Sequence, residues 1–420
     1  MLRRRDSRLS IRPTARGWQA LVAGVATLFV ARLIGTTQFH QLAYALLALP
    51  LASLIFGLLG SRGLLYSRVL PAGTRISAGD PSKVNLLLER SRFAATKAGV
   101  VDRLPEPRSF EFPRPRGRRA GSRIEASLDF ARRGVYELGP AEVSVADPFG
   151  LLSFARRFEQ RTEVVVYPKT HDLRGFLLRG GNVDAGARGS RGRRGEEFAG
   201  LREYRRGDDR RHIHWKSVAR TGELFVKEFS LQAPRRHTVV LDLRREGLRT
   251  QESEVEDAVS AAASVLAHLA HERLPVRLLC TDRVGASTEF AADEASYWEA
   301  MRLLATVRAD GGRPLGEALL AERGSLGEGV VLVSRTRDEE LPACVRKLKE
   351  TGLSVIVVAL ATHTYRTPPG SGGAAQSREA DFVRSINRLE AAGAAVRVVG
   401  HPEGVGGLSS GNNREVGAFR

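Results

Sequence analysis

The chain opens with two long apolar stretches. Residues 17–35 (GWQALVAGVATLFVARLIG) and 41–60 (QLAYALLALPLASLIFGLLG) each have about the 20 residues that a helix needs to cross hydrocarbon. Neither shows the polar stripe of a soluble core helix, and the one charge, Arg32, is close enough to a helix end to reach the headgroups. Pro50 is expected to kink the second helix without excluding it from the membrane. We predict a transmembrane helix hairpin over residues 17–60.

The distribution of positive charge around these stretches predicts their orientation. The loop over residues 36–40 has no Lys or Arg, whereas the tail over residues 1–16 carries Arg3, Arg4, Arg5, Arg8, Arg12 and Arg16. Positive residues stay on the cytoplasmic side. Both termini and the soluble domains are therefore expected in the cytoplasm. The alternative, a cleaved signal peptide, is disfavoured by the second span that follows the first so closely.

Residues 61–170 have the pattern of short strands. Apolar and polar residues alternate in segments 84–88 and 124–130, and apolar runs occupy 143–145 and 163–167. Pro, Gly and Asp fall between these segments, which is typical of turns. We predict an all-β immunoglobulin-like sandwich. The Pro- and Arg-rich stretch over residues 105–120 is expected to be an exposed loop.

Residues 235–400 alternate between buried-strand and amphipathic-helix patterns. Strands are predicted at residues 237–243, 275–281, 330–334, 354–360 and 395–399, and helices at residues 254–273, 295–308, 314–323, 339–351 and 378–392. This order indicates an α/β Rossmann-like domain with a parallel sheet, and any ligand site is expected beyond the carboxyl ends of its strands. Residues 171–234 are left as a linker, and residues 367–376 and the tail 401–420 are expected to be flexible.

Composition narrows the classes of function. Two cysteines, Cys280 and Cys344, are too few for a disulfide framework or a four-ligand zinc site. The 65 Lys and Arg against 47 Asp and Glu give a net charge of +18, which favours an anionic partner such as nucleic acid or lipid headgroups. Aromatic residues make up only 6% of the chain, so nucleic-acid binding is the weaker of the two interpretations. No phosphate-binding loop of the Walker type is present, so the chain is not expected to hydrolyse ATP.

The most distinctive segment lies between the two soluble domains. Its motif is Glu197-Phe198, then Leu201-Arg202-x-Tyr204-x-x-Gly207-Asp208-x-x-Arg211-x-Ile213-x-Trp215-Lys216-x-x-Ala219-Arg220. This motif resembles the signature of the bacterial family called domain of unknown function 58. The upstream Gly134-x-Tyr136-x-Leu138-Gly139-Pro140 and Asp147-Pro148-Phe149-Gly150 also resemble that family.

The resemblance implies a membrane-associated protein without an established reaction. It implies a C-terminal domain similar to a von Willebrand factor type A domain. By analogy it also implies the bacterial inner membrane as the location and a MoxR-type AAA+ ATPase as the partner in envelope-related assembly, with a transglutaminase-like membrane protein as a second candidate partner.

A type A domain usually binds a divalent cation through oxygen ligands from three loops. Here Arg244 and Glu246 follow Asp242 where serines would stand, Arg313 replaces a threonine, and Ser334 is followed by Arg335 in place of an aspartate. Three arginines directed toward one pocket would repel a cation and could neutralise Asp242. We therefore predict a degenerate site without a metal, and no cofactor.

The signature itself allows three interpretations. Asp208, His212 and His214 could be the acid/base set or metal ligands of a hydrolase or transferase. Alternatively, Arg202, Asp208, Arg211 and Arg220 could form a buried ion-pair network, with Tyr204, Trp215 and Phe229 packing between the domains. In the third interpretation, the surface that also carries Glu197, Gly207 and Lys216 binds a protein partner.

These observations favour a membrane-anchored, non-enzymatic scaffold or adaptor with a metal-free type A-like domain. The hydrolase or transferase is the first alternative, and a binder of nucleic acid or anionic lipid is the second. The basic loop over residues 188–194 (RGSRGRR) is either a solvated linker or a contact with anionic headgroups or an acidic partner, and its position near the membrane favours the headgroups.

Overall fold

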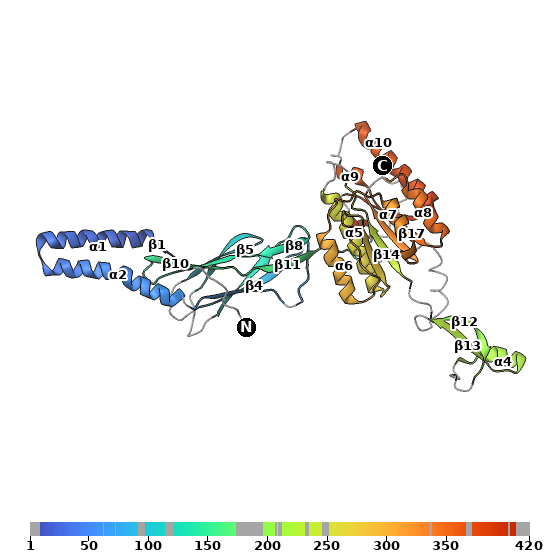
Figure 1. Cartoon of the computed structure of the whole chain (residues 1–420), viewed down its shortest axis with the longest axis horizontal. Coiled ribbons are helices and arrows are strands. Elements are labelled where there is room, and N and C mark those ends of the chain that lie inside the picture. Colours follow the sequence, from blue (N-terminus) through green and yellow to red (C-terminus); the bar gives the residue numbers. More distant parts are fainter. Residues whose placement is uncertain are drawn as a thin grey trace. The chain divides into compact units, whose positions relative to one another are not determined.

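The computed structural model describes most of the chain, in two compact units. The described residues are 9–61, 63–71, 73–90, 97–113, 121–173, 196–205, 208, 212–231, 235–245, 252–335, 338–366, 372–401 and 404–408. The first unit comprises residues 1–167 and the second residues 168–420 (Figure 1). Each unit is described by itself.

The first unit begins with two antiparallel helices, α1 (Ala15–Ile34) and α2 (Thr37–Ser61). Both are long and apolar enough to cross a membrane. Small residues at seven-residue intervals on α1, namely Gly17, Gly24 and Ala31, are buried. A Cβ atom on Gly24 would lie 2.8 Å from the Leu47 side chain, so the absence of a side chain allows the two helices to pack closely.

The segment before α1 is a strand, which differs from the predicted tail over residues 1–16. Strand β1 (Leu9–Pro13) pairs antiparallel with β10 (Leu152–Phe158), with Pro13 opposite Leu152. The chain therefore leaves through α1 and returns through α2 to the same β structure. The strand could not be predicted from the local sequence, because Leu9 pairs with Arg156, which lies 147 positions further along the chain.

The β part of the first unit contains three sheets around one core. Their strand orders are β1-β10-β9-β5-β6, β3-β11-β8 and β2-β4-β7. The remaining strands are β2 (Leu65–Val69), β3 (Ile76–Ser77), β4 (Ser82–Glu89), β5 (Ala98–Leu104), β6 (Glu106–Phe112), β7 (Gly121–Leu128), β8 (Gly134–Leu138), β9 (Ala141–Ala146) and β11 (Thr162–Tyr167). The predicted alternation is confirmed in β4, where Val84, Leu86 and Leu88 are buried in the core shared by the sheets.

The predicted loop over residues 105–120 is wrong in its first half. Residues Glu106–Phe112 form β6, which pairs with β5 and buries Phe112 completely. Strand β6 is at an edge of its sheet, where Pro107 does not interrupt a ladder of hydrogen bonds on both sides. Residues 114–120 lie outside the described residues.

The second unit contains a parallel sheet of order β15-β14-β16-β17-β18. Its strands are β14 (His237–Leu241), β15 (Val276–Cys280), β16 (Gly329–Ser334), β17 (Ser354–Leu360) and β18 (Ala395–Val399), close to the five predicted segments. Numbered within the domain, this order is 2-1-3-4-5. The strand order therefore reverses between β14 and β16, and a ligand site in such a sheet is expected beyond their carboxyl ends.

Helices cover both faces of this sheet (Figure 1). Helices α5 (Glu252–His271) and α6 (Glu294–Thr306) pack together on one face. Helices α7 (Leu315–Ala321), α8 (Leu341–Glu350) and α10 (Gly372–Ala391) pack on the other face, and the short α9 (Thr362–Arg366) follows β17. Apolar residues on one side of each helix bury against the strands, as their helical spacing predicts.

Two segments predicted to be flexible are partly ordered. Helix α10 begins at Gly372, inside the Gly- and Ser-rich stretch over residues 367–376. In the predicted tail, the 3-10 helix η4 (Val405–Leu408) packs against α5 and β18, and both Val405 and Leu408 are buried. Burial of these two apolar side chains stabilises a segment whose Gly content predicts disorder. Residues 409–420 lie outside the described residues.

The segment predicted as a linker also has a structure of its own. Strands β12 (Glu196–Glu203) and β13 (Phe225–Leu231) form an antiparallel two-stranded sheet, and the chain between them includes α4 (Trp215–Thr221). Ile213 adds a single bridge to Val226, and both side chains are buried. The hairpin holds the signature residues on one local scaffold.

Candidate functional site

The carboxyl edge of the parallel sheet is built around Asp242, which follows β14 and is fully buried. Its carboxylate accepts a 3.1 Å hydrogen bond from the backbone N–H of Arg244. Thr281, at the end of β15, accepts a 2.9 Å hydrogen bond from the N–H of Leu243 and lies 3.5 Å from the Asp242 carboxylate. These bonds hold the loop after β14 in one conformation at the point where the strand order reverses.

Gly311 closes this loop from the other side. Its N–H donates to the carbonyl of Leu243 at 3.1 Å, and its own carbonyl accepts from the N–H of Arg245 at 2.8 Å. A Cβ atom at Gly311 would lie 1.7 Å from the carbonyl oxygen of Thr281, so only glycine fits at this position. Gly311, two residues before Arg313, therefore has a packing role beside Asp242.

Arg335 follows β16 and is almost fully buried, with 4% of its surface exposed. Its Nε donates to the backbone carbonyl of Asp242 at 3.1 Å, and its NH2 group donates to the carbonyl of Arg244 at 2.7 Å. The guanidinium thus joins the loop after β14 to the end of β16. Bonds from a charged donor to buried carbonyls are among the stronger hydrogen bonds in proteins.

The other residues predicted for this degenerate site are not all brought together. Ser334 is buried beside Arg335, and Arg244 is half-buried. Arg313 is exposed, and its nearest acidic contact is Glu317, one helical turn further along at 3.9 Å. The expectation that three arginines converge on Asp242 is therefore wrong for Arg313, because its side chain extends into solvent at the start of α7. Glu246 lies outside the described residues.

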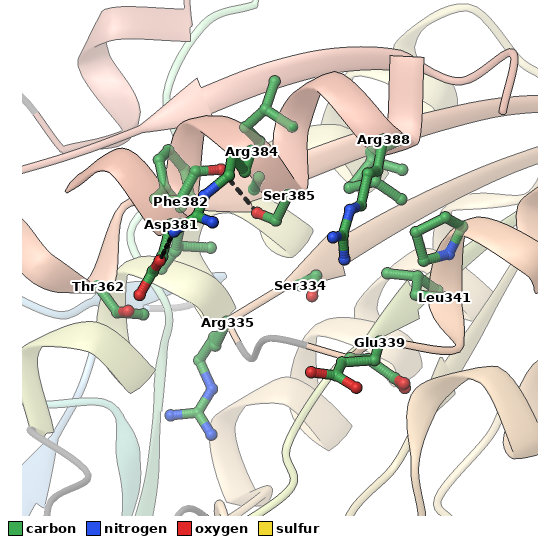
Figure 2. A pocket seen from close by; sticks show the side chains of 17 residues that line it. Ser334, Arg335, Glu339, Leu341, Thr362, Asp381, Phe382, Arg384, Ser385 and Arg388 are labelled. Atoms are coloured by element: carbon green, nitrogen blue, oxygen red, sulfur yellow. Dashed lines mark hydrogen bonds and ion pairs between the residues drawn. The ribbon is translucent and has the colours of Figure 1, made fainter. Parts of the chain in front are cut away.

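A cavity of about 300 Å³ lies beside this edge, at the carboxyl ends of β16 and β17 and between α8 and α10 (Figure 2). Its apolar lining includes Leu341, Val357, Phe382, Ile386 and Leu389. Its charged lining is mixed and consists of Arg335, Asp338, Glu339, Asp381, Arg384 and Arg388. The volume is at the lower end of the range for pockets that bind small molecules or single protein side chains.

Most of the charged groups around the cavity already have partners. Arg384 forms an ion pair with Asp381, and the carboxylate of Asp338 accepts from the N–H groups of Gly316 at 3.2 Å and Glu340 at 3.1 Å. Glu339 and Arg388 have no ion pair within the described part of the chain, and Figure 2 shows both among the residues around the open space. The cavity therefore offers one cation and one carboxylate to a binding partner.

The lining does not resemble a hydrolytic centre. The side chains drawn in Figure 2 include the hydroxyls of Ser334, Thr362 and Ser385, but no histidine or cysteine. The hydroxyl of Ser385 donates to the carbonyl of Phe382 at 2.7 Å, within its own helix. Of the carboxylates in the lining, Asp338 is bonded to backbone N–H groups and Asp381 to Arg384, and Glu339 has no hydrogen bond to these hydroxyls in the described part of the chain.

In the signature segment, Arg202 and Asp208 form a bidentate ion pair with two N···O distances of 2.8 Å. Asp208 also accepts a 2.8 Å hydrogen bond from the backbone N–H of Arg205. These donors lower the pKa of Asp208 to about 2, with the Arg202 side chain as the largest cause. The carboxylate is thus a stable anion that closes the turn after β12 and is not suited to act as an acid or base near neutral pH.

Trp215, a signature aromatic predicted to pack between the domains, is not buried within its own unit. Its side chain is 64% exposed at the start of α4. Lys216 and Arg220 on the same helix are also exposed, whereas Tyr204 is half-buried. Arg220 is therefore outside any buried network. Gly207 and Arg211 lie outside the described residues, and so do the side chains of Glu197 and Phe229.

The two signature histidines are half-buried beside the bridge at Ile213. His214 lies 2.8 Å from the hydroxyl of Ser217 through its Nδ1 atom, at the start of α4. Within the described part of the chain, no group of three or more His, Cys, Asp or Glu side chains could hold a metal ion. Asp208 is engaged with Arg202, so the proposed set of Asp208, His212 and His214 does not form a cluster there.

The sequence did not point to Glu339, Arg388 or the cavity that they line. Arg388 belongs to a helix whose polar face looks like any solvated helix surface. Glu339 precedes α8 by two residues, where an acidic side chain is common because it interacts favourably with the helix N-terminus. Only the position of both next to the ends of β16 and β17 distinguishes them, and the strand order that creates this position is not encoded locally.

The comparisons with known proteins agree with the family resemblance. Residues 200–289 match the sequence model of a family described as "Protein of unknown function DUF58". The matched segment covers most of the signature hairpin and the first strand-helix-strand part of the parallel sheet, through β15. A search of curated proteins gave no match.

Proposed function

The chain belongs to the DUF58 family, and from this premise we propose that it is a membrane-tethered adaptor that binds a protein partner and performs no reaction of its own. In this proposal the helix hairpin is the anchor, and the carboxyl edge of the parallel sheet is the recognition surface. The soluble parts lie in the cytoplasm, on the side that carries the positive flanking residues.

The observation that carries the proposal is the buried position of Arg335. At the sheet edge where a type A-like domain would offer oxygen ligands to a cation, a guanidinium donates to the carbonyls of Asp242 and Arg244. A fixed positive charge at this point disfavours a bound cation. The Arg335 side chain also holds the loops in place without a metal, so the carboxyl edge of the sheet is already formed before a partner binds.

Both soluble parts fit known architectures in this proposal. The sheet order and the helices on both faces support a von Willebrand factor type A-like domain, and the antiparallel bridges of Val276 to Ala291 and of Leu279 to Ser287 resemble its short edge strand. The shared core of the three sheets supports an immunoglobulin-like sandwich.

The partner that we propose is a MoxR-type AAA+ ATPase, working with the adaptor in assembly of envelope components. This choice rests on the family resemblance. The cavity beside Arg335 supports a protein partner in general. It has an apolar floor, and its Glu339 and Arg388 form no ion pair with the described residues, so they suit charged side chains at a protein interface. A transglutaminase-like membrane protein is a second candidate.

The rival hypotheses receive less support. A hydrolase or transferase built on Asp208, His212 and His214 would need these groups free and close together, whereas Asp208 is held by Arg202 and Arg205. A nucleic-acid binder would rely on the net charge of +18. Such a protein would bind DNA with an affinity that falls steeply as the salt concentration rises.

The test uses the full chain in detergent micelles and the purified MoxR-type ATPase from the same organism. We expect binding that Arg388→Glu weakens at least tenfold, because the substitution removes a cation from the cavity and adds a carboxylate to those already there. Arg346→Glu is the matched control, since Arg346 is exposed on α8 outside the cavity and has no ion pair among the described residues. Equal binding by both variants, or no binding by the parent chain, would contradict the proposal.

A calorimetric titration with Mg²⁺ tests the metal-free edge separately. The parent chain is expected to give no saturable heat of binding. Tight Mg²⁺ binding that disappears in Asp242→Ala would show that the edge is a cation site after all, and the adaptor proposal would lose its main support.

A further inference from the structure

The turn Asp147-Pro148-Phe149-Gly150 packs directly against the helix hairpin within the first unit. The Asp147 carboxylate is 2% exposed and accepts a 2.5 Å hydrogen bond from the hydroxyl of Ser53 on α2. It also accepts from the N–H groups of Phe149 at 2.9 Å and Leu152 at 2.6 Å. One carboxylate thus shapes the turn and attaches it to a helix that is apolar enough to span a membrane.

Two glycines allow close approach at the same place. A Cβ atom on Gly57 of α2 would lie 1.8 Å from the ring of Phe154 on β10, and a Cβ atom on Gly17 of α1 would lie 2.2 Å from the carbonyl oxygen of Leu151. The hydroxyl of Thr14 donates to the carbonyl of Gly150 at 2.7 Å. The ends of both helices are therefore packed onto β10 and the turn, without room for lipid between them.

The position along α2 at which the turn contacts the helix decides whether the bilayer reaches the turn. Ser53 and Gly57 face the β structure, but Leu51, Ile55 and Phe56 at the same level are 61%, 52% and 43% exposed. Exposed apolar side chains on adjacent turns of a spanning helix require hydrocarbon around them. The bilayer must therefore reach the level of the turn, and part of the β structure must meet it.

The β structure presents apolar side chains at that level. Phe149, at the tip of the turn, is 47% exposed. Ile11 on β1 is 40% exposed and lies opposite Phe154, so both side chains are on the sheet face that packs against α2. The apolar surface of α2 thus continues onto the edge of the sheet.

Two exposed cations are next to this surface in the chain: Arg16 precedes Gly17 on α1, and Arg12 follows Ile11 on the edge strand β1, with its side chain on the other face of the sheet. Arg12 on β1 and Arg16 on α1 are exposed, and neither has a hydrogen-bond or ion-pair partner within the described residues. Arg16 lies beside Gly150, since a Cβ atom there would be 3.9 Å from its guanidinium. An apolar patch with neighbouring arginines is the arrangement of proteins that insert into the interface of an anionic membrane.

We propose that Ile11, Phe149, Arg12 and Arg16 form an interfacial collar that embeds one edge of the β structure in the membrane and binds anionic lipid headgroups. This inference rests on the proposed membrane insertion of the hairpin. Lipid is the occupant that the surface favours, because the collar is continuous with the lipid-facing side of α2. The collar also fixes the orientation of the β structure relative to the membrane.

Tryptophan quenching tests the collar in nanodiscs whose phosphatidylcholine and phosphatidylglycerol carry brominated acyl chains. Three full-length chains each keep one tryptophan, at position 18, at position 149 through Phe149→Trp, or at position 135 through Val135→Trp; the native Trp18, Trp215 and Trp298 are otherwise replaced by Phe. Val135 is the matched control, because it is 46% exposed on β8, at the end of the β structure far from the helices (Figure 1).

We expect strong quenching at positions 18 and 149 and none at position 135. Quenching at 18 without quenching at 149 would overturn the collar and leave the membrane anchor intact. Quenching at neither 18 nor 149 would reject the anchor and the collar together. Equal quenching at 135 and 149 would overturn the assignment of the contact to this edge.

The headgroup preference has a test of its own. Native mass spectrometry of the purified chain gives the ratio of retained phosphatidylglycerol to phosphatidylcholine. Loss of both arginines in Arg12→Gln/Arg16→Gln is expected to lower the ratio by about fivefold per arginine. Arg103→Gln, an exposed arginine of β5, should leave the ratio unchanged. An unchanged ratio in the double variant would overturn the headgroup site.

Discussion

The guanidinium of Arg68 and the carboxylate of Asp102 form a buried bidentate ion pair that joins two sheets of the first unit. Both N···O distances are 2.7 Å, and Arg68 belongs to β2 while Asp102 belongs to β5. Arg68 also donates to the carbonyls of Leu138 at 3.3 Å and Gln160 at 2.8 Å. One arginine therefore connects β2 and β5 to β8 and the loop before β11.

Removal of one member of this pair is expected to be strongly destabilising. Asp102→Ala leaves the Arg68 charge buried without its partner, and such changes cost about 3–5 kcal/mol of unfolding free energy. The double variant Arg68→Met/Asp102→Leu should lose less than Asp102→Ala alone, because no unpaired charge remains. Thermal unfolding of the full chain in detergent measures both. If the double variant is less stable than Asp102→Ala, the attraction within the ion pair, and not the cost of an unpaired buried charge, accounts for most of the lost stability.

Tyr66 predicts how stability changes at alkaline pH. Its hydroxyl donates to Asp102, and burial, followed by the charge of Asp102, raises the pKa of Tyr66 well above its usual value. The unfolded chain loses this proton near pH 10 while the folded chain keeps it, so unfolding free energy should fall as the pH rises above about 10. In Tyr66→Phe this component of the pH dependence should be absent. An unchanged alkaline profile in that variant would contradict the assignment.

The bond from Ser53 to Asp147 predicts a graded loss of stability. Ser53→Ala removes one of three hydrogen bonds to the carboxylate and should cost about 1 kcal/mol. Asp147→Ala leaves Ser53 and the N–H groups of Phe149 and Leu152 without that acceptor and should cost about 2–4 kcal/mol. Differential scanning fluorimetry of the full chain in detergent compares them. Equal losses would indicate that the turn does not depend on Asp147.

Asp208 predicts a change at acidic pH. Its folded pKa of about 2 is below the usual value of 3.8, so its contribution to stability is present above pH 3.8 and is lost as the pH falls through 2. Arg202→Gln should shift the titration of Asp208 toward the usual value, because Arg202 is the largest cause of the lowered pKa. The carboxyl ¹³C shift of labelled Asp208 measures this, with Arg220→Gln as the control. An equal shift in the control would argue for a general charge effect.

Cysteine labelling tests the orientation of the hairpin. The native thiols should react little, because Cys280 and Cys344 are buried and burial, the largest cause, raises the pKa of Cys344 to about 11. In whole cells, Gln38→Cys, in the first turn of α2 next to the connection between the two helices, should react with an impermeant maleimide. Arg313→Cys, exposed in the second unit, should react only after the cells are permeabilised. The reverse pattern would place the soluble parts outside.

Local pattern was sufficient for much of the secondary structure. The two long apolar helices and the strands and helices of the parallel domain were predicted to within a few residues, because the spacing of apolar residues in a helix or strand depends only on neighbouring residues in the chain. Strand β6 and the start of α10 were missed because Pro and Gly weigh against regular structure locally. An edge position and burial of a few apolar side chains outweigh that preference.

The sequence by itself determined that the chain has a hydrophobic hairpin, a β-rich part, an α/β domain and the family signature. Tertiary structure alone decided that β1 pairs with β10, that Arg68 meets Asp102, and that Arg335 closes the loop after β14. It also separated Arg313 from the site to which its position in the sequence assigned it. The physical reason is distance along the chain. Periodicity acts between neighbours, whereas ion pairs, sheet order and cavities are made by residues that meet only after the chain has folded.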